Sequence, residues 1–190
     1  IQTYNRKSQR FSLMNLKEDI FIYKIPNFEN LKEDLLKSIK KSNSYSLNTK
    51  GEKITSCDYN FSKETNRPYV NFIYKNIISD FGKNFCIINN IHSIGVDNIW
   101  FQIYKKNDFH NLHTHPHANF TNVLYVKLPN KNLTTNVYNL KKEKISLNIE
   151  EGNILTFPAY YPHSSPKNIL DDEKIIVSFN TNVNIETVES

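Results

Sequence analysis

Glycine is scarce in this chain, with 4 residues among 190. Neither of the two glycine-rich phosphate-binding motifs, G-x-G-x-x-G or G-x-x-x-x-G-K-[ST], occurs in the sequence. No apolar run reaches the roughly 18 residues that a membrane-spanning helix requires. We therefore expect neither a nucleotide-binding loop of these kinds nor a membrane partner.

Cysteine is also rare, because Cys57 and Cys86 are the only two and no C-x-x-C pair is formed. This spacing favours free thiols over a disulfide framework or a cysteine-based zinc site. We accordingly expect a soluble, cytoplasmic protein in a reducing compartment.

Positive charge exceeds negative charge by 5, but no long basic block carries the excess. The lysines are scattered, with short pairs at most, such as Lys40-Lys41 and Lys105-Lys106. This distribution argues against nucleic acid as a partner and is compatible with a basic cleft for an acidic small molecule. The expected partner is a small-molecule or peptide substrate, and the sequence leaves the oligomeric state open.

The length and the hydrophobic content of 38% suit one folded domain over residues 1–190. A strand is expected at 20–25, followed by a helix whose apolar residues recur from Phe28 to Ile39. A second helix is predicted over 68–81, with Gly82 at its end. The polar segment 43–67 between the helices is interpreted as an irregular loop.

From residue 85 onward the hydrophobic period changes to two, which predicts short strands. The predicted strands cover 98–104, 121–128, 134–140, 144–149, 153–157 and 174–181. Helices followed by many short strands indicate an α+β, mainly β fold, with a jelly-roll barrel and N-terminal helices packed outside it. Residues 1–84 would form a helical or irregular cap, and residues 85–190 the jelly-roll core.

Histidine is concentrated in one segment, because four of the six histidines lie between His110 and His117. Residues i and i+2 of a strand point to the same face, so His113 and His115 can aim at one point. His163 can complete a triad from a distant strand. Three protein ligands with open positions are the general plan of a catalytic metal site. The pattern predicts a mononuclear iron site, at which His113, His115 and His163 are the catalytic residues and metal ligands.

Other assignments within this segment stay open. Non-heme iron sites commonly use two histidines and a carboxylate, but here His115 occupies the usual acidic position and Asp108 precedes His113. His117 shares the i, i+2 spacing with His115, although Pro116 between them suggests the end of the strand. His110 would point to the opposite face of a regular strand. A surface histidine run without metal is the alternative to any of these sites.

Two blocks of residues resemble the 2-oxoglutarate/Fe(II) oxygenases related to prolyl 4-hydroxylases. The first block contains Trp100-x-x-x-Tyr104, then His110-Asn111-Leu112-His113-Thr114-His115-Pro116, then Val123-Leu124-Tyr125-Val126-x-x-Pro129. The second runs from Glu151-Gly152-Asn153-Ile154-Leu155-Thr156-Phe157-Pro158 to His163 and on to Lys174-Ile175-Ile176-Val177-Ser178-Phe179-Asn180. The resemblance covers roughly residues 98–182.

The resemblance implies a double-stranded β-helix that holds Fe(II) and 2-oxoglutarate and consumes O2. Lys174 falls where the family usually has an arginine that pairs with the distal carboxylate of 2-oxoglutarate. The hydroxyl that the family carries two residues later is replaced by Ile176. In the alternating strand 174–180, Lys174, Ser178 and Asn180 share one face. Tyr104 and Tyr125 could donate hydrogen bonds to the bound carboxylate. The competing interpretations are a surface position for Lys174 and a core role for the two tyrosines.

The expected function is an Fe(II)- and 2-oxoglutarate-dependent dioxygenase that hydroxylates a C–H bond and releases succinate and CO2. Two other functions stay open. One is a cupin-like metal enzyme that does not use 2-oxoglutarate, and the other is a non-catalytic metal-binding or sugar-binding jelly roll. The sequence does not identify the substrate.

Overall fold

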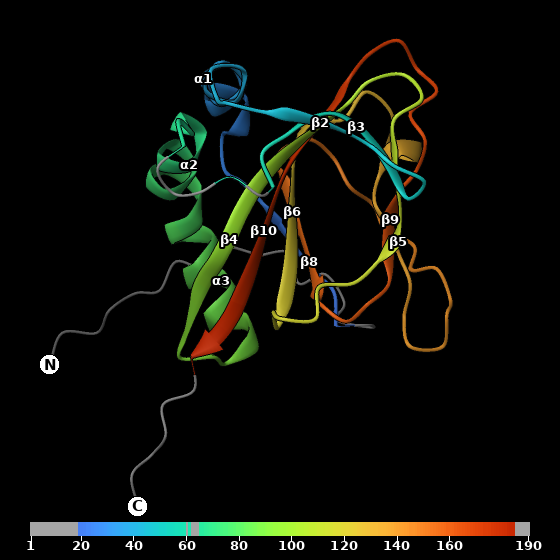
Figure 1. Cartoon of the computed structure of the whole chain (residues 1–190). Coiled ribbons are helices and arrows are strands. Elements are labelled where there is room, and N and C mark those ends of the chain that lie inside the picture. The colour runs from blue at the N-terminus through green and yellow to red at the C-terminus, as the bar shows by residue number, and fades with distance from the viewer. Residues whose placement is uncertain (1–18, 60, 62–64, 185–190) are drawn as a thin grey trace, which may run out of the picture.

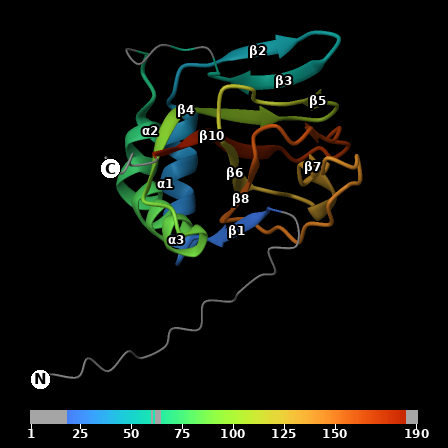
Figure 2. The same cartoon turned by 90° about the horizontal axis from the view of Figure 1, so that it is seen from below.

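The computed structural model describes residues 19–59, 61 and 65–184, which form a curled antiparallel sheet with helices against one face (Figures 1 and 2). The strands are β1 Phe21–Lys24, β2 Tyr45–Asn48, β3 Glu52–Cys57, β4 Ser93–Tyr104, β5 Phe109–His113, β6 Phe120–Lys127, β7 Asn136–Val137, β8 Asn153–Pro158, β9 His163–Ser165 and β10 Lys174–Asn184. The helical segments are α1 Phe28–Lys40, α2 Pro68–Ile73, the π-helical η1 Tyr74–Ile78, α3 Ser79–Asn89 and the 3-10 turn η2 Lys131–Leu133.

The sheet runs in the order β1-β8-β6-β10-β4-β3-β5-β9-β7, and β2 pairs with β3. The long strands β8, β6, β10 and β4 form its centre, and α1, α2 and α3 lie to one side of them (Figure 2). The short strands β5, β7 and β9 lie on the other side, so the sheet curls over itself. This is the jelly-roll architecture that the sequence predicts, with the helices outside the barrel.

Strand β10 shows how period-two alternation separates the two faces of the sheet. Ile175, Val177 and Phe179 join the core between the sheet and the helices. Ile176 belongs to the second core, inside the curl, together with Tyr104 and Phe157. Because both faces are covered, the strand is buried from Lys174 to Thr181. The predicted common face of Lys174, Ile176 and Ser178 is therefore the interior of the curl.

The prediction of an irregular loop at 43–67 is wrong for residues 45–57, because β2 and β3 form a hairpin there, and residues 60 and 62–64 of that range lie outside the described residues. Strand β3 pairs with both β4 and β5, and thus links the central strands to the short strands of the site. Ile54 and Cys57 of β3 are buried in the inner core. The few apolar residues among many polar ones leave too weak an alternation for the sequence to reveal these strands.

Other elements also differ from the prediction, and the strand predicted at 134–140 is reduced to β7 at Asn136–Val137. The second helix does not end at Gly82, but continues through α3 to Asn89. Asn90 adopts the left-handed conformation at its end, with φ of 51°, a position that asparagine tolerates better than most residues. The strand predicted at 144–149 is absent, and a single bridge joins Tyr138 and Lys144. Ile145 and Ile149 are buried without forming a ladder.

The sequence analysis also makes predictions about the cysteines and about membrane-spanning helices. Cys57 and Cys86 are both free thiols. Among the parts of the chain that the structure describes, no helix combines the length and the apolar character needed to cross a membrane.

Candidate metal centre and cosubstrate pocket

Strand pairing brings the distant histidines together. β5 runs antiparallel to β9, and in this register His113 lies directly opposite His163. His115 lies two residues beyond the end of β5, where its backbone N–H donates to the carbonyl of Ala159 at 2.9 Å. This bond ties the chain beyond β5 to the segment before β9, and the rings of His113 and His115 lie with their centroids 5.2 Å apart.

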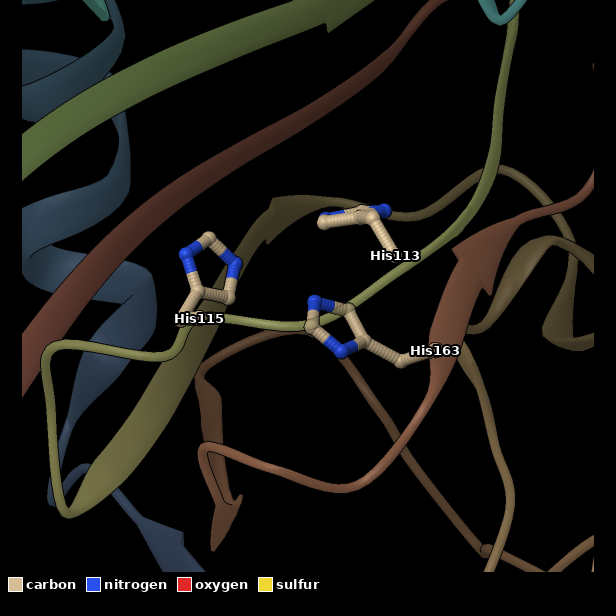
Figure 3. A group of neighbouring side chains, drawn as sticks. All are labelled: His113, His115 and His163. Carbon is tan, nitrogen blue, oxygen red and sulfur yellow. The ribbon is translucent and has the colours of Figure 1, made fainter.

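The three imidazoles surround one point inside the curl (Figure 3). One ring nitrogen from each of His113, His115 and His163 lies within 4.8 Å of the others. Two of these residues come from the β5 end and the third from β9, so the triad depends on correct folding of the sheet edge. The structure thus brings together all three histidines that the sequence analysis selects.

Hydrogen bonds fix the orientation of two rings. Nδ1 of His113 lies 2.8 Å from the carbonyl of Asn111, and Nδ1 of His163 lies 3.0 Å from the carbonyl of Tyr161. Because a carbonyl only accepts, each Nδ1 must carry the proton. This leaves both Nε2 atoms as free electron-pair donors, which is the usual arrangement of metal-binding histidines.

Burial favours the neutral, metal-binding form of each imidazole. It lowers the pKa of His163 well below the ordinary value, with further lowering from His113. Burial and the neighbouring His113 lower the pKa of His115 to about 4. Burial also lowers the pKa of His113, although the hydrogen bond to the Asn111 carbonyl and the charge of Glu52 act in the opposite direction. Three neutral nitrogen donors with open space between them fit a divalent transition metal.

The other candidates in this segment do not join the triad. Asp108 is buried and accepts hydrogen bonds from the backbone N–H and hydroxyl of Thr55 and from the N–H of Lys105, which commits it to a structural role. His117 is exposed in the turn after the strand. No carboxylate joins the three histidines among the residues that the structure describes.

The orientation expected for His110 is wrong. The pairing of β5 with β9 is irregular between His110 and His113, so the strand does not alternate regularly there. As a result, the His110 ring stacks on that of His113, with centroids 3.8 Å apart and planes 15° apart. His110 therefore faces the same cavity as the triad.

A second polar centre lies deeper in the same curl. Lys174 is 1% exposed, donates to the hydroxyl of Ser165 at 2.8 Å, and places its ammonium 5.0 Å from the centre of the Tyr104 ring. Within the described residues, no acidic side chain lies within salt-bridge distance of Lys174. Burial lowers the pKa of Lys174 to about 7. An unpaired cation at this depth is costly unless an anion accompanies it.

The remaining predicted cosubstrate residues divide into two groups. Tyr104 and Ser178 line the cavity. Tyr125 is buried outside the cavity lining, and its hydroxyl accepts a hydrogen bond from the backbone N–H of Thr135 at 3.1 Å. Asn180 accepts a hydrogen bond from the hydroxyl of Thr121 at 3.2 Å, and of these two only Thr121 lines the cavity. The structure thus brings Tyr104 and Ser178 to the site and leaves Tyr125 and Asn180 beside it.

The triad and the surroundings of Lys174 belong to one cavity of about 260 Å³. This size is close to the lower end of small-molecule sites. Its walls combine the histidines, hydroxyl groups and aromatic rings: His110, His113, His115, His163, Tyr59, Trp100, Tyr104, Thr114, Thr121, Thr135, Ser164, Ser165 and Ser178, with Leu47, Glu52, Cys57, Gln102, Val123 and Ile176.

Sequence reasoning missed several polar residues of this cavity, among them Ser165 and Glu52. Ser165 follows His163 by two positions on β9, so the same spacing rule that joins His113 and His115 could have identified it. Glu52 lies on β3, within the segment interpreted as a loop. Nothing in the local sequence connects it with the histidines.

No protein-family model matches the chain, and a comparison with curated protein sequences finds no match. Solved structures do match. A 2OG-Fe(II) oxygenase family oxidoreductase from Burkholderia pseudomallei is 10% identical, with a TM-score of 0.69 over 86% of this chain and 85% of that one. A Trichoplax adhaerens prolyl hydroxylase, in complex with a hypoxia-inducible factor peptide, is 10% identical, with a TM-score of 0.63 over 88% and 84%.

The chain has the fold of the 2-oxoglutarate/Fe(II) oxygenases. HygX from Streptomyces hygroscopicus, solved with nickel, 2-oxoglutarate and hygromycin B, shares this fold at 7% identity, with a TM-score of 0.62 over 88% of this chain and 84% of that one. Identities this low establish the oxygenase fold only.

Proposed function

We propose that this protein is an Fe(II)- and 2-oxoglutarate-dependent dioxygenase that hydroxylates a C–H bond of a peptide or small-molecule substrate. One observation carries the proposal: in a fold of the oxygenase type, a three-histidine cluster lies in one cavity with Ser165 and Tyr104, and behind these two residues lies a buried lysine without an acidic partner among the described residues. A three-histidine metal site alone would suit many classes of enzyme. The additional buried cation calls for an anionic ligand beside the metal.

The residues have distinct roles in this proposal. His113, His115 and His163 would hold Fe(II), which with 2-oxoglutarate and O2 supplies the oxidising chemistry and yields succinate and CO2. Lys174 would attract the distal carboxylate of 2-oxoglutarate, with the Ser165 hydroxyl and Tyr104 fixing the position of its ammonium group. Ser178, Tyr125 and Asn180 complete the proposed surroundings, the last two from behind the cavity wall.

The substrate class is proposed from the fold neighbours. The Trichoplax adhaerens enzyme is in complex with a peptide fragment, and HygX holds the small molecule hygromycin B. The cavity of this chain opens beside Tyr59, whose side chain is 44% exposed and packs edge-on against Trp100. The exposed ring of Tyr59, supported by the buried Trp100, would offer a surface to either kind of substrate.

One feature favours a second candidate, a cupin-like metal enzyme that does not use 2-oxoglutarate. The position usually filled by a carboxylate ligand holds His115, and three neutral ligands leave the metal more positive by one charge. The two candidates differ in cosubstrate dependence, so the same experiment separates them.

The test is an anaerobic titration of the protein with Fe(II) and 2-oxoglutarate, followed by visible absorption. We expect a weak charge-transfer band that requires both additions and is lost in His113→Ala. His117→Ala, which changes an exposed histidine outside the triad, should retain it. Metal binding without the band would favour the cupin-like enzyme, and the absence of metal binding would contradict both.

A further inference from the structure

The three-histidine centre lacks a negative charge that a carboxylate ligand would provide. An imidazole that donates a ring electron pair to a metal is neutral, so three such ligands contribute no negative charge. A divalent ion held by these ligands would therefore keep its full charge inside a partly buried cavity. Among the described residues that line this cavity, Glu52 is the one acidic side chain.

Strand pairing places Glu52 beside the triad. Glu52, the first residue of β3, is the register partner of His110 on β5. Its Oε2 lies 3.2 Å from Nε2 of His110, and the His110 ring stacks on the ligand His113 with centroids 3.8 Å apart. One imidazole therefore separates the carboxylate from a metal ligand. Each of these two contacts is shorter than the Debye length, which is about 10 Å at 0.1 M salt.

No lysine or arginine pairs with Glu52 in the described parts of the chain. Its neighbour at ion-pair distance there is His110, whose Nε2 lies 3.2 Å from Oε2 and whose ring lies against the ligand His113. The adjacent Lys53 points to another acid, with Nζ 3.8 Å from Asp108. The side chain of Glu52 is 24% exposed, so water screens its field only in part.

We propose that Glu52 supplies, from outside the coordination sphere, the negative charge that the third ligand of this metal centre lacks. The proposal rests on the proposed metal-binding function. Glu52 is a positioning and charge-compensating residue: it orients His110 against His113 and stabilises positive charge at the metal. Carboxylates in the outer shell of histidine sites commonly act in this way. Here the carboxylate contacts His110, and the His110 ring in turn stacks on the ligand His113.

The test compares Glu52→Gln with the wild type in the absence of 2-oxoglutarate. Glutamine keeps the length of the side chain and an acceptor for His110, but removes the charge. We expect Fe(II) affinity, measured anaerobically by competition with a chromophoric chelator, to fall roughly tenfold. The midpoint potential of the Fe(III)/Fe(II) couple should rise. A negative charge near the iron stabilises Fe(III) more than Fe(II), so its removal favours the reduced state.

Two further variants separate charge from mechanical support. Glu143→Gln removes an exposed carboxylate that accepts from Asn139 away from the cavity, and should leave affinity and potential unchanged. His110→Phe keeps a flat ring against His113 and the charge of Glu52 but removes the contact between them, and should raise the potential less than Glu52→Gln does.

Three outcomes would overturn the proposal. If Glu52→Gln binds Fe(II) with unchanged affinity and potential, the carboxylate does not act on the metal. If its affinity falls while the potential stays constant, its role is only structural. If the wild type binds no Fe(II), the metal centre itself is wrong and this inference fails with it. Because no 2-oxoglutarate is present, failure of the cosubstrate assignment alone would not affect the result.

Discussion

Lys174 shows at the scale of a single residue how a ligand site can cost stability. Its ammonium group is buried without an acidic partner among the described residues, and its pKa falls to about 7 from the ordinary 10.5. The unfolded chain therefore binds this proton more tightly than the folded protein does. Below about pH 7 the protonated lysine destabilises the fold in full, and this cost declines as the pH rises from 7 towards 10.5.

Lys174→Met should consequently stabilise the protein while weakening its proposed ligand site. We expect the free energy of unfolding to rise by about 1–4 kcal/mol at pH 6, as for other buried charges replaced by apolar side chains. The gain should shrink at pH 9. Affinity for 2-oxoglutarate in the presence of Fe(II) should fall at least about tenfold, because a charged hydrogen bond is lost.

Urea unfolding at the two pH values and calorimetric titration with 2-oxoglutarate measure these effects. Lys167→Met, at an exposed position in the segment between β9 and β10, is the matched control and should change neither quantity. An equal stability gain at both pH values would mean that Lys174 is not a buried cation. Unchanged affinity for 2-oxoglutarate would remove it from the site.

At the scale of elements, the turn before β8 depends on Gly152. Its φ is +76°, and a Cβ added there would lie 2.6 Å from Cγ of Phe28 on α1. The turn also ties elements together, since Gly152 donates its N–H to the carbonyl of Tyr125 and accepts from the N–H of Ile25. Both the backbone conformation and the close contact exclude a side chain.

Gly152→Ala should therefore lower the free energy of unfolding by about 2 kcal/mol or more. Gly51→Ala is the control, because its φ is not positive and the nearest atom to an added Cβ is 3.9 Å away. Thermal unfolding of both variants provides the measurement. A loss in Gly152→Ala no larger than that in Gly51→Ala would show that Phe28 and the turn can adjust.

Elements with strong periodicity could be predicted from the sequence, and those that depend on distant pairing could not. The helix from Phe28 and the buried strand from Lys174 follow from local patterns. The hairpin of β2 and β3 does not, since its side chains are mostly polar. The triad could be predicted because i, i+2 spacing survives folding. Glu52 could not, because its place beside His110 is set by the register of two strands far apart in sequence.

At the scale of the whole molecule, Asp58 connects the helical layer with the sheet. It is fully buried, and its carboxylate accepts from the N–H of Phe101 on β4, the hydroxyl of Tyr69 on α2 and Nε of Arg67. Arg67 also donates to the carbonyl of Ile99. These contacts hold the end of β3, the start of α2 and the middle of β4 in one arrangement.

Asp58→Asn should destabilise the whole fold by about 3–5 kcal/mol, because it removes a fully buried charge and leaves the partly buried Arg67 guanidinium without its counter-charge. Asp171→Asn removes an exposed acid that pairs with Lys106 at 2.8 Å, and should cost no more than about 1 kcal/mol. Chemical denaturation followed by circular dichroism measures both variants. If both variants lost a similarly small amount of folding free energy, water or a rearranged side chain would have to replace the Asp58 carboxylate.

The opposition of His113 and His163 across β5 and β9 has a consequence for the folding of the barrel edge. An ion bound by both would act as a cross-link between strands that are otherwise short, and it would close a loop of chain that contains β6, β7 and β8. By analogy with disulfides, closing a loop of this size removes chain entropy from the unfolded state equivalent to on the order of 4 kcal/mol. Metal binding would then contribute to the folding of the barrel. Part of the measured metal affinity would reflect the ordering of β5 and β9 at the edge of the barrel.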